Sequence, residues 1–230
     1  PSDPSGIAGA YWKLNAEPGA PDDGTLVVGE DLTLISDLAV PAEGQHDLYL
    51  WLQDAAGNVD HRNRNVLIRA FSFDATPPIT TLNLDGPQGL DDWYTGVVDG
   101  TLEAVDPVSG VEDSRYRIDA GEWVTDTTFS LDADGVYGVD YHSWDVAGNV
   151  ESAHTVTVSI DSLPPTTAHL PSSPPGPGGW YSTSVTVTFT IADATSGPLA
   201  VNYRLNGGEW FTGTQVSLAN DGQHLVEYRG

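Results

Sequence analysis

A long stretch of the sequence recurs after 87 residues, and this repeat constrains the fold more than any other feature. The segment GLDDWYTGVVDGTLEAVDPVSGVEDSRYRIDAGEWVTDT (89–127) aligns without gaps with GPGGWYSTSVTVTFTIADATSGPLAVNYRLNGGEWFTGT (176–214). The segments FSFDATPPITT (71–81) and VSIDSLPPTTA (158–168) keep the same offset. The matched pairs include Trp93/Trp180, Tyr94/Tyr181, Asp106/Asp193, Tyr116/Tyr203 and Trp123/Trp210. The chain is therefore built from successive copies of one unit.

The repeat predicts three units. The first, residues 1–76, lacks the opening strands of the others and carries 14 extra residues within 16–33, which predict a lengthened acidic hairpin. The second, residues 77–163, is complete. The third, residues 164–230, ends before its own D-x-A-G-N turn and last strand. We expect a segment of a longer chain, because unfilled positions would expose both core and sheet edge.

Each unit reads as a series of short strands. VVDGTLEAVD and SVTVTFTIAD alternate apolar and polar residues with a period of two, which predicts strands with one buried face. SRYRIDAGEW and VNYRLNGGEW each read as two strands joined by a tight turn, since Asp-Ala-Gly and Asn-Gly-Gly tolerate positive φ. About seven strands per unit, with turns every 8–12 residues, are typical of an immunoglobulin-like (Ig-like) sandwich. We predict an all-β protein of tandem Ig-like β-sandwiches arranged as a rod.

The charge of the chain excludes some partners. The 230 residues include 33 Asp and Glu but only eight Lys and Arg, for a formal net charge of −25. Such a field repels phosphate, so we expect no nucleic-acid binding. No apolar run approaches a membrane span, and without Cys there is neither a disulfide framework nor a thiolate metal site. The field would attract cations, calcium above all outside a cell.

The combined pattern resembles a known family. The order D-x-x-S-G, Y-x-I/L-D/N-x-G-x-W, D-x-A-G-N and I-D-x-x-P-P-T-T resembles the tandem Ig-like repeats of large prokaryotic (bacterial-type) surface and secreted proteins and adhesins. The resemblance covers essentially the whole chain. It implies a stalk, spacer or adhesin shaft at the cell surface or in the extracellular medium. The same unit accompanies many functions, so the resemblance predicts fold more strongly than function.

Two D-x-A-G-N turns are the first candidate sites. They span Asp54–Asn58 and Asp145–Asn149. In such a turn Asp accepts hydrogen bonds from amides further along, Gly takes a left-handed conformation and Asn braces the loop. Carboxylate, carbonyl and amide oxygens also suit Ca²⁺, so Asp54, Asn58, Asp145 and Asn149 are metal candidates as well. The sequence favours the structural interpretation.

The linkers DATPPITT and DSLPPTTA are the second candidate sites. Two prolines make each connection stiff and extended. Asp74 and Asp161 close the units before them, and in related stalk proteins acidic residues at such joints hold calcium, so the resemblance implies an interdomain Ca²⁺ site there. No D-x-D cluster accompanies them, and Asp106 and Asp193 are predicted to brace turns. The protein needs no cofactor on this interpretation, with Ca²⁺ left open.

Catalysis finds no support in the sequence. Six His residues are scattered without a metal-binding spacing such as H-E-x-x-H, and there is no G-x-S-x-G motif. Exposed Trp rings could form a carbohydrate platform, but repetition of Trp93/Trp180 and Trp123/Trp210 favours packing. We therefore predict that the protein is not an enzyme.

The predicted function is that of a structural extracellular segment. Its partners would be neighbouring Ig-like units of the same chain or of like subunits, with a surface glycan or a protein receptor as further candidates. Two alternatives stay open: a strand-complementing subunit of an extracellular filament or sheath, and a carbohydrate-binding ancillary module of a secreted hydrolase.

Overall fold

The computed structural model describes residues 6–29, 32, 34–36, 38–63 and 71–230. Part of the predicted first unit, including residues 1–5, 64–70 and part of its acidic insertion, lies outside the described residues. Within them there is no α-helix, and two short 3-10 helices interrupt the strands. The predicted all-β class with Ig-like sandwiches is confirmed.

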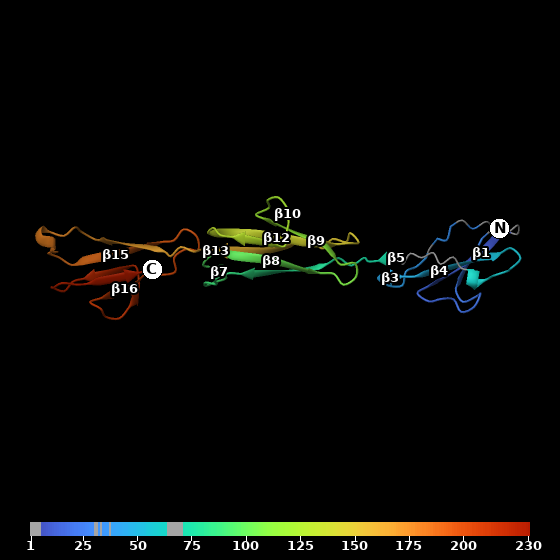
Figure 1. Cartoon of the computed structure of the whole chain (residues 1–230). Helices are drawn as coiled ribbons and strands as arrows, with labels where there is room; N and C mark the ends of the chain where they lie inside the picture. The colour runs from blue at the N-terminus through green and yellow to red at the C-terminus, as the bar shows by residue number, and fades with distance from the viewer. Residues whose placement is uncertain (1–5, 30–31, 33, 37, 64–70) are drawn as a thin grey trace. The chain divides into compact units, whose positions relative to one another are not determined.

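The first part of the chain contains two small sheets (Figure 1). Their elements are β1 (Ile7–Leu14), β2 (Thr25–Val28), β3 (Gly44–His46), β4 (Leu48–Asp54), the 3-10 helix η1 (His61–Asn63) and β5 (Phe71–Phe73). One sheet has the order β2-β1-β4, and β3 pairs with β5 in the other. β1 and β2 are antiparallel and joined by a long loop, which begins at Asn15 in the left-handed region (φ 61°).

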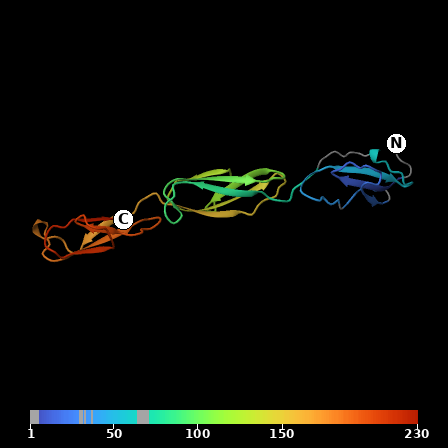
Figure 2. The same cartoon turned by 90° about the horizontal axis from the view of Figure 1, so that it is seen from below.

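The second sandwich has two sheets that face each other (Figures 1 and 2). Its strands are β6 (Ile79–Asp85), β7 (Trp93–Tyr94), β8 (Val98–Val105), β9 (Val111–Ile118), β10 (Val124–Thr125), β11 (Thr128–Leu131), β12 (Gly135–Asp145) and β13 (His154–Ile160). The five-stranded sheet has the order β10-β9-β12-β13-β7, and the three-stranded sheet has the order β11-β8-β6. β7 and β13 are parallel, a pairing that brings the start and the end of the sandwich together.

Alternation in the sequence produces the core of this sandwich. Along β8, Val98 and Leu102 are buried while Asp99 and Glu103 are exposed, as a period of two requires. Both sheets contribute to one apolar cluster, whose buried members are Val98, Phe129, Leu131, Val139, Val158 and Ile160. Burial of these side chains is the main stabilising contribution, at about 25 cal/mol per Å² of apolar surface.

The third sandwich repeats most of this pattern. Its elements are β14 (Thr166–Pro171), the 3-10 helix η2 (Pro177–Gly179), β15 (Val185–Ala192), β16 (Asn202–Leu205), β17 (Phe211–Thr212), β18 (Gln215–Leu218) and β19 (Val226–Arg229). The sheets have the orders β14-β15-β18 and β17-β16-β19. β15, β17 and β18 lie 87 residues after β8, β10 and β11, so the repeat correctly locates these strands.

One cross-strand pair differs in size between the two sandwiches. In the second, Phe129 lies opposite Gly100, and a Cβ added at Gly100 would overlap the Phe129 ring. In the third, the equivalent pair is Val216 opposite Val187, both buried. The Phe129 ring fills the space beside Gly100 in the second sandwich, whereas two valine side chains share the equivalent space in the third.

A hydrogen bond recurs at the start of the long strand in each repeat. Tyr137 donates its hydroxyl to the carbonyl oxygen of Ala133, at 2.9 Å. The equivalent ring nitrogens, Nε2 of His46 and of His224, lie 2.7 and 2.9 Å from the carbonyl oxygens four residues earlier. A carbonyl oxygen only accepts, so both His residues carry their proton on Nε2. The bond resembles the tyrosine corner of Ig-like folds.

Candidate functional site

Three aspartates that are distant in sequence meet at one end of the second sandwich. Asp74 follows β5, Asp106 follows β8, and Asp145 ends β12. One carboxylate oxygen from each lies within 4.8 Å of the other two. All three belong to the same compact unit of the chain, residues 1–81, 103–115 and 141–153. The structure therefore brings two predicted metal candidates, Asp74 and Asp145, together with a third carboxylate.

The loops around these carboxylates are held by neutral donors. Asp106 Oδ1 accepts the amides of Val108, Ser109 and Gly110 at 2.8 to 3.0 Å. The Ser109 amide also donates to Asp74 Oδ2 at 2.9 Å, so one N–H group is shared between two aspartates. Such a tight arrangement of amides around Asp106 is the turn brace that the D-x-x-S-G motif predicts.

Asn149 connects Asp145 with Asp74. Its backbone amide and side-chain Nδ2 donate to Asp145 Oδ1 and Oδ2, both at 2.8 Å. Nδ2 also lies 3.2 Å from the backbone carbonyl oxygen of Asp74. Gly148 has a φ of 93°, which the turn requires and which favours glycine. Asp145 is 1% exposed, so this D-x-A-G-N turn holds a buried carboxylate.

One oxygen of the cluster, Oδ2 of Asp106, is buried and has no hydrogen-bond partner among the described residues. Burying a carboxylate oxygen without a partner costs free energy. Calcium takes oxygen ligands at about 2.3–2.6 Å, so two oxygens on one ion lie at most about 5 Å apart, and the separations within this cluster meet that limit. The donor set fits a divalent cation.

Hydrogen bonds keep Asp74 ionised. The Ser109 side chain, followed by the backbone amides of Thr76 and Ser109, lowers the pKa of Asp74 below its usual value, and partial burial opposes this. The ionised form is the one that binds metal.

A related arrangement recurs one repeat later. Asp161 Oδ2 accepts the amide of Ser196 at 3.0 Å, and Asp193 Oδ1 accepts the amides of Thr195 and Gly197 at 3.1 and 2.9 Å. The pKa of Asp161 is lowered, first by the Ser196 side chain. Position for position this matches the contacts of Asp74, Ser109 and Asp106. The metal candidate Asp161 thus lies beside Asp193 but has no described equivalent of Asp145.

The remaining metal candidates, Asp54 and Asn58, form an isolated turn. Asn58 donates its backbone amide and Nδ2 to the two Asp54 oxygens at 2.7 and 2.6 Å. These bonds lower the pKa of Asp54, and the bond from the Asn58 side chain contributes most. No other carboxylate from the described residues joins this turn to make a three-ligand cluster.

The D-x-x-S-G motif predicts only a turn brace at Asp106. Its second oxygen becomes a candidate ligand because three separate loops meet at one end of the sandwich. A local motif such as D-x-D cannot detect that arrangement. The signal that was available is the recurrence of Asp106 as Asp193, in step with Asp74 and Asp161.

The repeated tryptophans have different surroundings. Trp123 and Trp210 stack against arginines of the adjacent strand: the Arg117 and Arg204 guanidinium carbons lie 4.7 and 4.8 Å from the respective ring centroids. Trp93 is half-buried, whereas Trp180 is 61% exposed. Trp93 and Trp180 therefore occupy equivalent positions in the repeat but differ in exposure.

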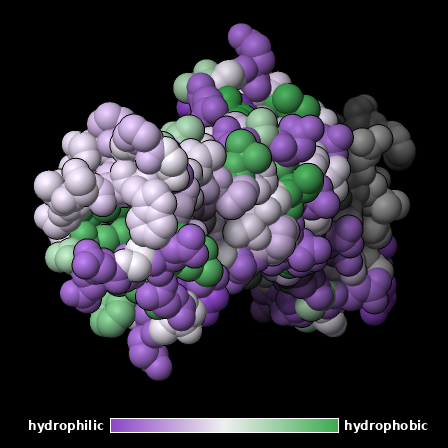
Figure 3. Space-filling view, turned by 90° about the vertical axis from the view of Figure 1, so that its left-hand side faces the viewer, coloured by the Kyte–Doolittle hydropathy of each residue, from purple (hydrophilic) through white to green (hydrophobic). Residues whose placement is uncertain are grey.

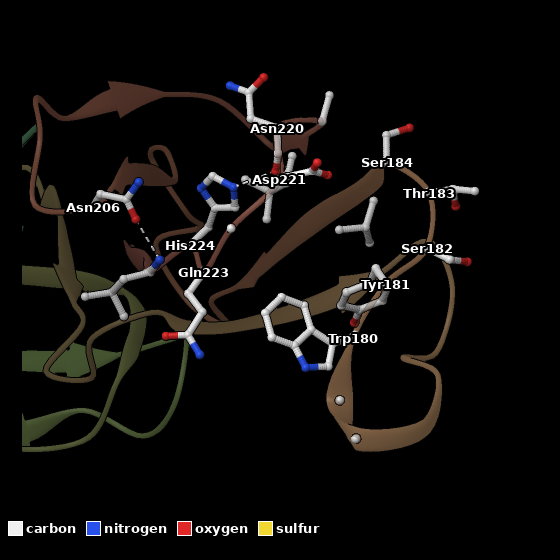
Figure 4. A pocket seen from close by; sticks show the side chains of 17 residues that line it. Trp180, Tyr181, Ser182, Thr183, Ser184, Asn206, Asn220, Asp221, Gln223 and His224 are labelled. Atoms are coloured by element: carbon white, nitrogen blue, oxygen red, sulfur yellow. Dashed lines mark hydrogen bonds between the residues drawn. The ribbon is translucent and has the colours of Figure 1, made fainter.

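Trp180 lines a groove of about 920 Å³ in the third sandwich. The groove is formed by residues 178–185, Asn206 and residues 218–225. Trp180 and Tyr181 lie on one side of it, and Asp221 and His224 on the other (Figure 4). Hydrophobic side chains are also visible among hydrophilic ones on the face of the molecule turned to the viewer in Figure 3.

Comparisons with known proteins add fold likeness only. No family model matches the sequence, and no curated protein matches it. A solved structure described as the D00-D0 domain of intimin is similar over 64% of this chain and 91% of its own, with 14% identity and a TM-score of 0.34. Fibronectin(III)-like modules of CbhA from Clostridium thermocellum are similar over 69% and 80%, with 12% identity and a TM-score of 0.28. Likenesses of this size are no basis for assigning a function.

No helix among the described residues is both long and apolar enough to cross a membrane.

Proposed function

We propose that this chain is a non-catalytic extracellular segment whose Ig-like sandwiches act as a stalk, spacer or adhesin shaft of a larger surface or secreted protein. The observation that carries the proposal is a repeated hydrogen bond in which a backbone amide donates to a carboxylate, from Ser109 to Asp74 and, 87 residues on, from Ser196 to Asp161. The contact thus occurs in two successive repeats, as expected for a part whose role depends on repetition of the unit.

The sequence on either side of this contact supports a spacer. Each of these aspartates is followed within four residues by Pro-Pro, and proline fixes φ and removes an amide donor. Such a linker resists folding back, so successive sandwiches keep their separation. The net charge of −25 adds mutual repulsion along the chain and solubility in an extracellular setting.

Small-angle X-ray scattering tests the spacer role. A compact globule of this length has a radius of gyration of about 17 Å. Three sandwiches in line, each as long as the 11-residue β12, would span about 110 Å and give about 30 Å. We expect a value near the larger figure. A radius near 17 Å for the monomer would contradict the proposal.

Two exposed Pro-Pro pairs provide a matched comparison. Replacing both Pro164 and Pro165 with Gly should lower the radius of gyration, because the linker then bends freely. The same change at Pro174 and Pro175, in a loop within the third sandwich, should leave it unchanged.

We propose further that Asp74, Asp106 and Asp145 hold a calcium ion in this setting. The carboxylate separations and the partnerless Asp106 Oδ2 support this. The ion would bind three loops together at one end of the sandwich. A ligand at one hundred times its Kd stabilises the folded state by about 2.7 kcal/mol, so calcium should raise the midpoint of thermal unfolding and EGTA should reverse the rise.

Isosteric amide variants locate the ion. Asp106→Asn keeps an oxygen for the three amides but replaces a carboxylate ligand, so the calcium-dependent shift should be lost. Asp54→Asn, in the isolated turn, should retain the full shift. An equal midpoint in calcium and in EGTA for the unchanged protein would remove the metal proposal and leave the spacer proposal intact.

A further inference from the structure

The outer face of one sheet in the third sandwich carries a row of threonines. Along β15, Thr186, Thr188 and Thr190 alternate with the buried residues Val187 and Phe189, so the threonine side chains point to the outside of the sandwich. β15 is the central strand of its sheet, between β14 and β18. Three hydroxyl groups therefore form the middle row of this face.

The flanking strands add only uncharged side chains. In β14, Leu170 lies opposite Thr188 and is 70% exposed. In β18, Gln215 lies opposite Thr188, and Ser217 lies opposite Thr186 with the two hydroxyl oxygens 2.9 Å apart. The other outward positions of these strands are Thr166, Ala168 and Ala192. No outward side chain of β14, β15 or β18 is charged, and we call this surface the threonine face.

The equivalent face of the second sandwich is acidic. Its three carboxylates, at Asp85, Asp99 and Glu103, are all exposed. The residues 87 positions later are Ser172, Thr186 and Thr190. Each carboxylate is thus replaced by a hydroxyl group in the third sandwich. The second sandwich includes β13 and still exposes this face, so the exposure is a property of the repeat.

A second copy of the chain is the partner that the threonine face fits best. The net charge of −25 makes two copies repel each other, and a surface without carboxylates is where they approach at the least cost. A hydroxyl group both donates and accepts hydrogen bonds, so a row of threonines is complementary to an identical row. A two-fold interface requires this self-complementarity. A charged partner finds no opposite charge on this face.

We propose that two copies of the chain associate through their threonine faces, about a two-fold axis that passes close to Thr188. Thr188 lies in the middle row, with Leu170 on one side and Gln215 on the other. The face is about 10 Å wide between its outer strands and about 20 Å long. This is much smaller than the roughly 800 Å² per partner of a stable interface, so the association is weak and reversible, with a Kd of about 0.1–1 mM. This inference goes beyond the spacer role and does not depend on it.

Sedimentation equilibrium of the whole chain tests the proposal. A monomer–dimer equilibrium should be measurable, and salt should strengthen it by screening the repulsion between the remaining carboxylates. Thr186→Asp combined with Thr190→Glu reproduces the carboxylates of the second sandwich and should raise the Kd at least about tenfold. Asn83→Asp combined with Gln88→Glu adds the same charge to the second sandwich and should leave the Kd unchanged.

A single introduced cysteine locates the axis. The chain has no Cys, and a residue at a two-fold axis meets its own copy, so Thr188→Cys should form a covalent dimer under mild oxidation. Thr101→Cys, at the equivalent exposed position of the second sandwich, should crosslink much less.

Three results would each overturn the proposal: a monomer at about 1 mM chain in high salt, an equal Kd for the two charge variants, and equal crosslinking at positions 188 and 101. Protection of Thr188 from hydrogen exchange by a neutral oligosaccharide, in a chain that stays monomeric, would assign the face to a glycan and overturn it as well.

Discussion

Replacing the Gly100/Phe129 pair of the second sandwich with the Val-Val pair of the third should show strong energetic coupling between positions 100 and 129. Phe129→Val removes four side-chain carbons from a buried position, and at about 0.8 kcal/mol for each the cost is about 3 kcal/mol. Gly100→Val places a side chain where the Phe129 ring lies, which costs about 1–3 kcal/mol through overpacking. The double variant has the Val-Val pair of the third sandwich, so it should be at least about 2 kcal/mol more stable than the sum of the single changes predicts.

Native-state hydrogen exchange can measure this coupling in the full chain. The amide of Leu102, which donates to the carbonyl oxygen of Thr127 at 2.7 Å, reports on opening of β8 next to the pair. Amides of β15 in the third sandwich are the internal control and should not change. The reciprocal double change, Val187→Gly with Val216→Phe, should show coupling of the same sign.

Simple additivity would show that Gly100 and Phe129 are not coupled. If the free energies of the two single changes sum to that of the double variant, the ring and the glycine do not share one space. A Gly100→Val variant as stable as the unchanged protein would also contradict the coupling.

Three further perturbations have defined outcomes. The pKa of Asp54 should lie below its usual 3.8, so the stability that its bonds to Asn58 contribute is present above pH 3.8 and is lost as the pH falls through the lower pKa of the folded state. Carboxyl NMR of Asn58→Ala should show a higher pKa of Asp54, and an unchanged titration would contradict this. Arg204→Lys should raise the lowered pKa of Glu227 toward 4.5, because lysine cannot form the bidentate pair that Arg204 makes at 2.7 and 2.8 Å. NMR titration measures the pKa of Glu227, and identical titration curves for the variant and the unchanged protein would count against this prediction. Glu151→Gln should lower stability in urea by about 1–3 kcal/mol, because a buried acceptor of backbone amides becomes partly a donor; an unchanged midpoint would exclude that role.

The sequence predicts the strands of this protein well, because alternation and turn residues act over short distances. The alternating segment that contains Val98 and Leu102 forms β8, and its copy forms β15 at the expected offset. The D-x-A-G-N turns could also be anticipated, since Asp, Gly and Asn each have a local conformational reason to occupy their positions. These features depend on residues within a few positions of one another.

What the sequence does not reveal depends on strand order. Asp74, Asp106 and Asp145 come together because three loops end on the same side of a sandwich, and no local spacing encodes that. The parallel pairing of the two-residue strand β7 with β13 is equally hidden, because no local pattern connects residues 93–94 with residues 159–160. The metal candidates could therefore be named singly from the sequence but not assembled.

The unequal pair at one register position bears on how repeats avoid one another during folding. Neighbouring sandwiches of similar sequence are prone to exchange strands, which traps misassembled chains. If β8 paired in the third sandwich, Gly100 would face Val216 across a void; if β15 paired in the second, Val187 would collide with Phe129. Both exchanges are penalised, so each newly made sandwich selects its own strands even though its neighbour offers close copies of them.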